Sequence, residues 1–300
     1  MRVTNKMLVN NYLSSLNKSL DLQSRLQEKL ADGKALHRAS DDPVKTIRAL
    51  RHRANLAGNE QYTQNAETAL SWMETTDSSL SDLSSIMTRA KELTIQAISS
   101  NTEDSFKAIG SEIDGLIKQA IQIGNTKIGD RYVFAGQMDK TEPIQYSDGQ
   151  YKYLGDDNKI SMVIQAGSAN PDRDSVNLTG HEVFGSSMEM LRHLQSIKDQ
   201  LNTGHPNLTT LSNEALGWIE QDHDRLLNQQ TQLGGRYSMY EMANNLLKNN
   251  NVIITDDLSK SEDLDVPKAL MDFKTSQNVY TAALSIGAKI MPTSLVDFLK

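Results

Sequence analysis

The sequence predicts a mainly α-helical protein that carries a β-rich insert. Over long stretches at both ends of the 300-residue chain, apolar residues recur every three or four positions, which is the spacing of one face of an amphipathic helix. Between them, residues 131–186 are rich in turn residues and in Tyr, Val, Ile and Phe, which favour strands. Because aromatic residues are only 5% of the chain, we expect narrow helix seams more than one thick core.

Composition and charge exclude several classes of function. The net charge of −7 argues against nucleic acid or an anionic membrane as the main partner. The absence of cysteine excludes disulfides, thiolate metal sites and cysteine nucleophiles. No run of about 18 apolar residues occurs, so no membrane insertion is expected. The first residues lack the apolar stretch of a secretory signal, so we expect any export to proceed without a cleaved signal peptide.

The first helix is expected from about residue 7 to residue 36, and Gly33 lies where a C-cap could be. Its apolar residues form two neighbouring stripes and so one wide face. We predict this face to be an assembly interface, made of Leu8, Val9, Leu13, Leu16, Leu20, Leu26 and Leu30.

A joint is predicted at Ser40, Asp41, Asp42 and Pro43. A carboxylate just ahead of proline can accept from the free N–H groups of a helix's first turn, where proline has no N–H to leave unpaired. The residue before proline also resists helical geometry, so Asp42 should mark a true break. We interpret the joint as the boundary between an assembly arm and the body of the protein.

Helices are expected over 43–100 and from about 105 to 124, with a turn at 101–104, and again around 190–201 and 216–247. Long helices joined by short turns predict an antiparallel bundle. The last of these has a long heptad seam, in which polar residues such as His223 can fix the register. In the insert, Asp148-Gly149 between alternating runs predicts a hairpin, and 160–164 a further strand.

The final segment has the same heptad character as the first, and both stripes are expected to pair. A two-helix seam buries only part of each side chain, so we expect the pair to be stable chiefly against other copies of the chain. In the C-terminal segment the predicted assembly interface consists of Leu270, Phe273, Tyr280, Leu284, Met291, Leu295 and Phe298.

No catalytic, metal or cofactor site is predicted, and the chain is not expected to be an enzyme. Asp222, His223 and Asp224 cannot converge on one ion, because successive helical residues point about 100° apart. His223 falls on the seam, where a hydrogen-bonded structural histidine is expected. The pairs 156–157 and 256–257 are interpreted as turn and helix-start residues, and the glycines at 124 and 129 lack the lysine of a phosphate-binding loop.

Several segments resemble the flagellin superfamily. They are 26–34 followed by the Ser-Asp-Asp-Pro joint, and 288–300 with its proline and apolar tail. Within the superfamily, three segments are typical of the branch of proteins that join hook and filament. Residues 69–76 with 89–93 are more similar to that branch than to filament flagellin, 1–4 match its usual opening, and 132–136 match the entry into its β-rich domain.

This resemblance implies an elongated rod with a terminal helical assembly domain (1–40 plus 256–300), a helical body (41–130 plus 187–255) and an outer β-rich domain (131–186). It implies a structural, secreted role at the hook–filament junction of the bacterial flagellum, after type III export. The implied partners are other copies of the chain, hook-associated protein 1, flagellin and an export chaperone. Two alternatives stay open, namely filament flagellin and a helical coiled-coil signalling or scaffold protein.

Overall fold

The computed structural model describes residues 2–100, 102–147, 149–165 and 175–290. The chain forms two compact units, one from residues 1–58 and 250–300 and the other from residues 59–249. Two long helices, α2 (Pro43–Ser99) and α7 (Leu216–Glu262), contribute residues to both units. The fold is mainly helical with a small antiparallel β portion, as the sequence predicts. The division into three domains remains a prediction.

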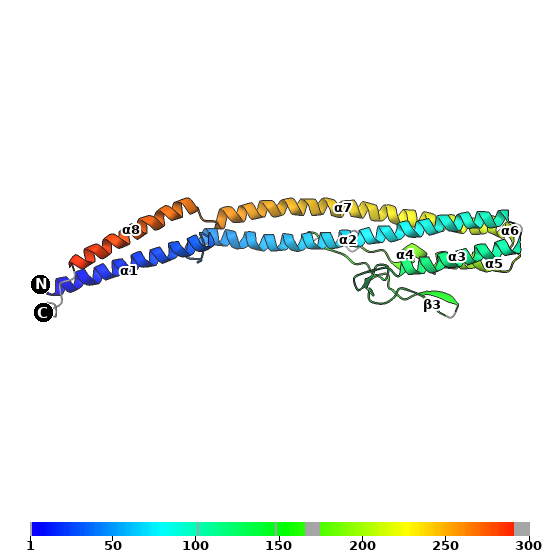
Figure 1. Cartoon of the computed structure of the whole chain (residues 1–300), viewed down its shortest axis with the longest axis horizontal. Coiled ribbons are helices and arrows are strands. Elements are labelled where there is room, and N and C mark those ends of the chain that lie inside the picture. The colour runs from blue at the N-terminus through cyan, green and yellow to red at the C-terminus, as the bar shows by residue number, and fades with distance from the viewer. Residues whose placement is uncertain (1, 101, 148, 166–174, 291–300) are drawn as a thin grey trace. The chain divides into compact units, whose positions relative to one another are not determined.

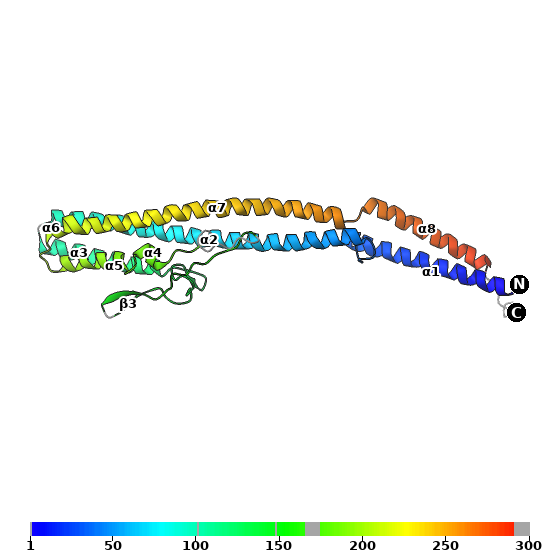
Figure 2. The same ribbon diagram turned by 180° about the vertical axis from the view of Figure 1, so that it is seen from behind.

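The first unit pairs the two ends of the chain. Helix α1 (Arg2–Asp32) packs along α8 (Val266–Ile290), as Figures 1 and 2 show. Gly33 ends α1 with φ +72°, and its N–H donates to the carbonyl of Lys29 at 3.0 Å. Left-handed geometry costs glycine little, so this residue provides the predicted C-cap.

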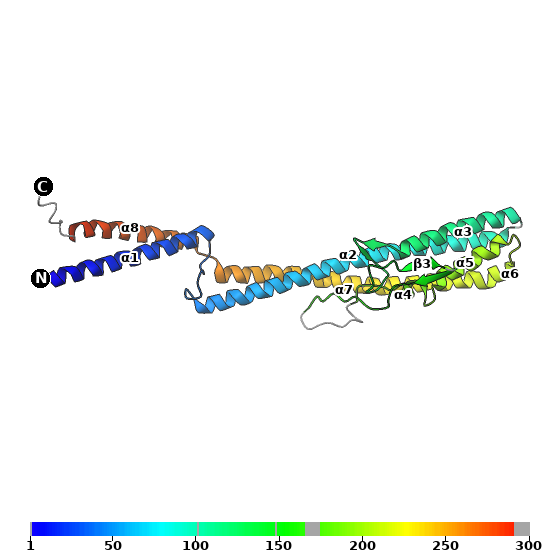
Figure 3. The ribbon, with the colours of Figure 1, turned by 90° about the horizontal axis from the view of Figure 1, so that it is seen from below.

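The second unit is a helical bundle. In it α2 and α7 run side by side, joined by α3 (Glu103–Gly124), α5 (Glu189–Asn202) and the short turns α6 (Leu208–Thr210) and η1 (Leu211–Ala215), a π-helical turn (Figure 3). The predicted seam of α7 is confirmed, because its members from Leu216 to Leu247 are all buried or half-buried. His223 lies on this seam and shares a hydrogen bond with the Ser84 hydroxyl at 2.8 Å, as expected of a structural histidine.

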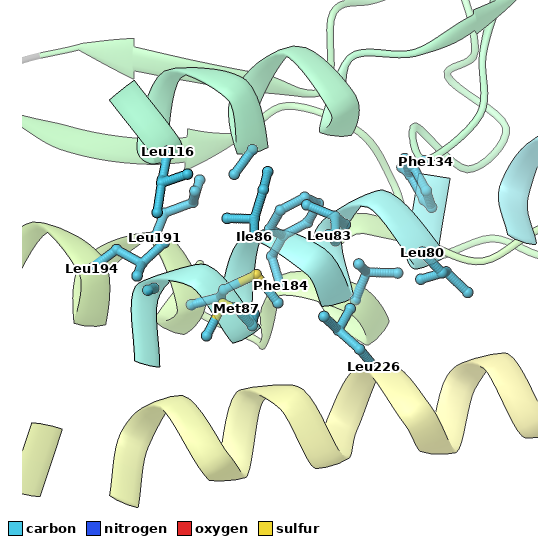
Figure 4. Packing of buried hydrophobic residues seen from close by; sticks show 14 of the residues in the cluster. Leu80, Leu83, Ile86, Met87, Leu116, Phe134, Phe184, Leu191, Leu194 and Leu226 are labelled. Atoms are coloured by element: carbon cyan, nitrogen blue, oxygen red, sulfur yellow. The ribbon is translucent and has the colours of Figure 1, made fainter. Parts of the chain in front are cut away.

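The core of this unit lies where α2 meets its neighbours. Figure 4 shows Leu80, Leu83 and Met87 of α2 among side chains from α3, α5 and α7. Phe134 and Phe184 add an edge-to-face aromatic pair at 6.4 Å between ring centroids, which closes the core toward the insert.

The insert is smaller in strand content than its sequence predicts. The hairpin forms between β3 (Ile144–Ser147) and β4 (Gln150–Tyr153), although Asp148 itself lies outside the described residues. A second ribbon pairs β1 (Lys127–Ile128) with β2 (Arg131–Tyr132). The strand expected at 160–164 is wrong, because its described residues pair only through one isolated bridge from Ser161 to Ser175. The short helix α4 (Gly180–Phe184) also lies within the segment.

A helix start at Asp256 and Asp257 is also wrong. Both residues lie inside α7, which continues without a break to Glu262. The start of the last helix is capped instead by Asp265, whose Oδ1 accepts from the Lys268 N–H at 3.2 Å.

Candidate assembly surface and joint

The two arm helices meet along a heptad seam. The α1 residues that face α8 are half-buried and step by three and four, namely Val9, Tyr12, Leu16, Ser19, Gln23, Leu26 and Leu30. The α8 residues that face α1 have the same spacing and are buried or half-buried; four of the six are small, in the series Ala269, Phe273, Ser276, Tyr280, Ala283 and Gly287. The small residues let the two helices approach closely, as in a coiled coil.

One contact fixes the register of this pair. The Tyr12 hydroxyl donates to the carbonyl of Ala283 at 2.8 Å, and its ring lies over Gly287. A Cβ added at Gly287 would lie 2.1 Å from the Tyr12 hydroxyl, so the glycine makes room for the ring. Tyr12 is absent from the interface predicted by sequence, although it lies one helical turn from both Leu8 and Leu16, which belong to that interface.

The close seam leaves larger side chains outside. We call the exposed leucines Leu13, Leu20, Leu270 and Leu284 the outer flanks of the arm; Leu20 is 50% and Leu270 is 49% exposed. Val266, Met271, Val279 and Ile286 are also exposed on α8. Large apolar side chains exposed at so many positions of two paired helices make the arm a candidate interaction surface.

The structure therefore divides the predicted interface residues into two groups. Six of them lie half-buried between the helices, namely Val9, Leu16, Leu26, Leu30, Phe273 and Tyr280, and four form the outer flanks. The side chain of Leu8 and residues Met291, Leu295 and Phe298 lie outside the described part of the chain.

The joint has the capping geometry that its sequence predicts. Pro43 is the first residue of α2, and the Asp42 carboxylate accepts from the Lys45 N–H at 3.0 Å. Asp41 accepts from the N–H groups of His37 and Arg38, both at 3.3 Å. These aspartates thus hold the turn that leads from α1 into α2, while Ser40 is exposed.

A buried carboxylate links this turn to the end of α7. The Glu262 side chain is 5% exposed, and its Oε1 lies 2.6 Å from Lys34 Nζ and 2.5 Å from Arg53 Nη2. Its backbone carbonyl accepts from the Ala35 N–H at 2.7 Å. We call Glu262, Lys34 and Arg53 the joint clamp, because these contacts hold the turn after α1 and the first part of α2 to the end of α7.

The same contacts set the protonation of the clamp. Burial alone would raise the pKa of Glu262, but its hydrogen bonds with Arg53 and Lys34, and their charges, hold that pKa below its usual value. Burial likewise opposes ionisation of Asp41, and the His37 and Arg38 amides outweigh it, so the pKa of Asp41 is also lowered. Both carboxylates are therefore charged near neutral pH.

Sequence reasoning missed the joint clamp, because Glu262 is more than 200 residues away from Lys34 and Arg53 in the chain. It also missed a buried network in the second unit, where Asp222 is 2.7 Å from His193 Nδ1 and 3.2 Å from Arg225 Nη1. In the described part of the chain, no cluster of three or more His, Asp or Glu side chains could hold a metal ion. No described helix is both long and apolar enough to span a membrane.

Comparison with known proteins agrees with this architecture. Residues 3–139 match the family described as the bacterial flagellin N-terminal helical region. Flagellar hook-associated protein 3 of Escherichia coli is 27% identical over 188 residues, which are 62% of this chain and 57% of that protein. The match thus spans little more than half of that relative. The flagellin of Bacillus subtilis is 23% identical over 304 residues, with 94% and 93% of the two chains covered.

Solved structures show the same fold. A flagellar hook-associated protein from Vibrio parahaemolyticus superposes with a TM-score of 0.67 at 16% identity, covering 74% of this chain and all of that one. Flagellar hook-associated protein 3 from Legionella pneumophila gives a TM-score of 0.61 at 16% identity, covering 70% and 97%.

The fold defines a mainly helical protein in which the first and last helices, α1 and α8, pair with each other. The resemblance to the flagellin superfamily is confirmed, because residues 3–139 match its N-terminal helical region and the chain is similar to both hook-associated protein 3 and flagellins. Those proteins are structural components of the flagellum and not enzymes, in agreement with the sequence.

Proposed function

We propose that this protein joins the flagellar hook to the filament. The observation that carries the proposal is the arm, where two paired terminal helices leave leucines exposed on their outer flanks. Fully burying one leucine contributes about 1.5–3 kcal/mol, so covering several half-exposed ones gives a neighbour substantial binding energy. The matches to hook-associated protein 3 favour the junction.

The proposed partners follow from this role. Copies of the chain pack through their arms, with hook-associated protein 1 on the hook side and flagellin on the filament side. Export proceeds through the flagellar type III apparatus with a chaperone that covers the apolar arm.

Filament flagellin is the second candidate. It is favoured by the match to Bacillus subtilis flagellin, which extends over 94% of this chain. The two roles differ in copy number, because a junction needs few copies and a filament very many.

Immuno-gold labelling of intact flagella separates the two roles. A single labelled band beside the hook is the expected result. Label along the whole filament would show that the chain is flagellin, and absence of label from flagella would contradict both roles and favour a scaffold elsewhere in the cell.

A further inference from the structure

A strongly basic segment surrounds the joint of this acidic protein. Residues 34–53 contain six lysines and arginines but only two acidic residues, a net charge of +4 in a chain of net charge −7. The arm's apolar flanks do not explain this concentration of charge.

The outward side of α2 combines these charges with apolar side chains. Lys45, Arg48 and Arg51 are exposed at intervals of three, and none has an ion-pair partner among the described residues. Residues three apart lie on one face of a helix. Beside them Val44, Ile47 and Leu50 are 59%, 61% and 57% exposed. We call these six residues the joint strip.

The intramolecular contacts of the first unit use other cations. Glu262 is already paired with Lys34 and Arg53, and Asp41 lies 3.8 Å from Lys29 Nζ. The joint strip is therefore left with unpaired positive charge and uncovered apolar surface, which together fit an acidic, apolar partner surface.

The chain itself carries such a surface. Residues 252–272 contain six acidic residues and two lysines, a net charge of −4. Near the end of α7, Val252 and Ile253 are 69% and 59% exposed, one turn from Asp256 and Asp257. Asp257 has no ion-pair partner within the described residues, while Asp256 has only the exposed Lys260. We call these four residues the acidic segment.

We propose that the joint strip of one copy binds the acidic segment of a neighbouring copy. The inference rests on the proposed assembly function, and it adds a charged contact between copies to the apolar contact made by the outer flanks of the arm. Opposite charges fix which copies meet and in what register, whereas apolar flanks alone specify register weakly. A second copy is favoured over another acidic protein because one sequence supplies both surfaces, within segments whose net charges are +4 and −4.

Charge reversal tests this pairing. Arg48→Glu with Arg51→Glu makes both surfaces acidic, and Asp256→Lys with Asp257→Lys makes both basic. Each double variant should reduce incorporation of the full chain into flagella, in cells lacking the native protein, by roughly tenfold. All four changes in one chain should restore incorporation, because the two reversed surfaces attract each other again. Co-expression of the two double variants should restore it in part, because contacts between unlike variants are then attractive.

Matched controls lie in the second unit. Lys140→Glu with Arg192→Glu, and Glu214→Lys with Asp224→Lys, change net charge equally at exposed residues that have no described ion-pair partner. These controls should incorporate normally. Normal incorporation of the strip variants, or no rescue by the combined changes, would overturn the inference. The proposed function would still stand if variants of the outer flanks were excluded from flagella.

The absence of natural cysteine permits a direct check. Cells that co-express Arg48→Cys and Asp257→Cys chains should yield a disulfide-linked pair of the two chains in assembled flagella under oxidising conditions. Cross-linking no greater than that of Lys140→Cys with Asp257→Cys would contradict the contact.

Discussion

Replacing Glu262 by glutamine should loosen the joint while leaving the rest of the chain folded. The substitution keeps the size of the side chain and removes the charge that holds Lys34 and Arg53. Glu262 is 5% exposed, with contacts of 2.6 Å to Lys34 Nζ, 2.5 Å to Arg53 Nη2 and 2.9 Å to Arg53 Nε.

The expected magnitude follows from these contacts. A hydrogen bond to a charged group contributes about 1.5–3 kcal/mol. The side chains of Lys34 and Arg53 are 47% and 48% exposed, so water screens them and they can be hydrated again when the carboxylate is lost. We therefore expect the free energy of local opening to fall by roughly 1–2.5 kcal/mol, less than for a fully buried pair.

Hydrogen exchange measures this opening directly. The Ala35 N–H donates to the Glu262 carbonyl and the Leu264 N–H to the Gly33 carbonyl, so both amides report on the joint. Their exchange should become about 5–70-fold faster, since 1.4 kcal/mol is tenfold.

Glu241→Gln provides the matched control, because Glu241 is exposed on the same helix and has no ion-pair partner among the described residues. Unchanged exchange in Glu262→Gln would refute the joint clamp. The joint clamp would also be refuted if the double variant lost the sum of the opening free energies lost by Glu262→Gln and Arg53→Gln. Two residues that interact directly should have non-additive effects.

Three further predictions concern the same unit. Asp42→Ala removes the cap of α2 and should lower stability by about 0.5–2 kcal/mol; an unchanged melting temperature would show that the cap lies elsewhere. Gly287→Leu should destabilise the α1–α8 pair by about 1–3 kcal/mol through its clash with Tyr12, and Tyr12→Ala should relieve part of the loss; equal losses with and without Tyr12 would exclude the clash. Because the pKa of Glu262 is lowered on folding, its stabilisation is present above about pH 4.5 and is lost as the pH falls through the folded value; exchange at the joint, corrected for its intrinsic rate, should be constant from pH 6 to 8 and rise in acid, and greater protection in acid would contradict this.

The regular parts of the fold could be predicted because local patterns determine them. Pro43, Asp42 and Gly33 mark helix ends through backbone chemistry that needs no distant partner. The heptad spacing of α7 is also local, and it identified the buried side of a 47-residue helix.

The sequence-based predictions fail where contacts between distant parts of the chain determine the local structure. Asn249, Asn250 and Asn251 disfavour a helix only slightly, by well under 1 kcal/mol each, so α7 continues through them. Just before them, Asn59 Nδ2 donates to the Leu247 carbonyl at 2.8 Å and holds the helix against α2. The segment 160–164 has strand-forming residues but little strand pairing, since side-chain composition does not provide a neighbouring strand.

The assembly surface could be predicted only in part. Heptad spacing identified the apolar residues of α1 and α8, but not which of them face each other. The small side chains at Ala269, Ser276 and Ala283 draw the helices together, and the larger Leu270 and Leu284 are left outside. The joint clamp gave no sequence signal, because Lys34, Arg53 and Glu262 meet only after folding.

The central claim is that the outer flanks of the arm mediate assembly. The direct test is the amount of full-length Leu13→Gln/Leu20→Gln/Leu270→Gln/Leu284→Gln protein that enters flagella, relative to unaltered protein. We predict that this variant is exported and keeps the helical content of its body, yet is absent from assembled flagella. Normal incorporation of the folded variant would contradict the account.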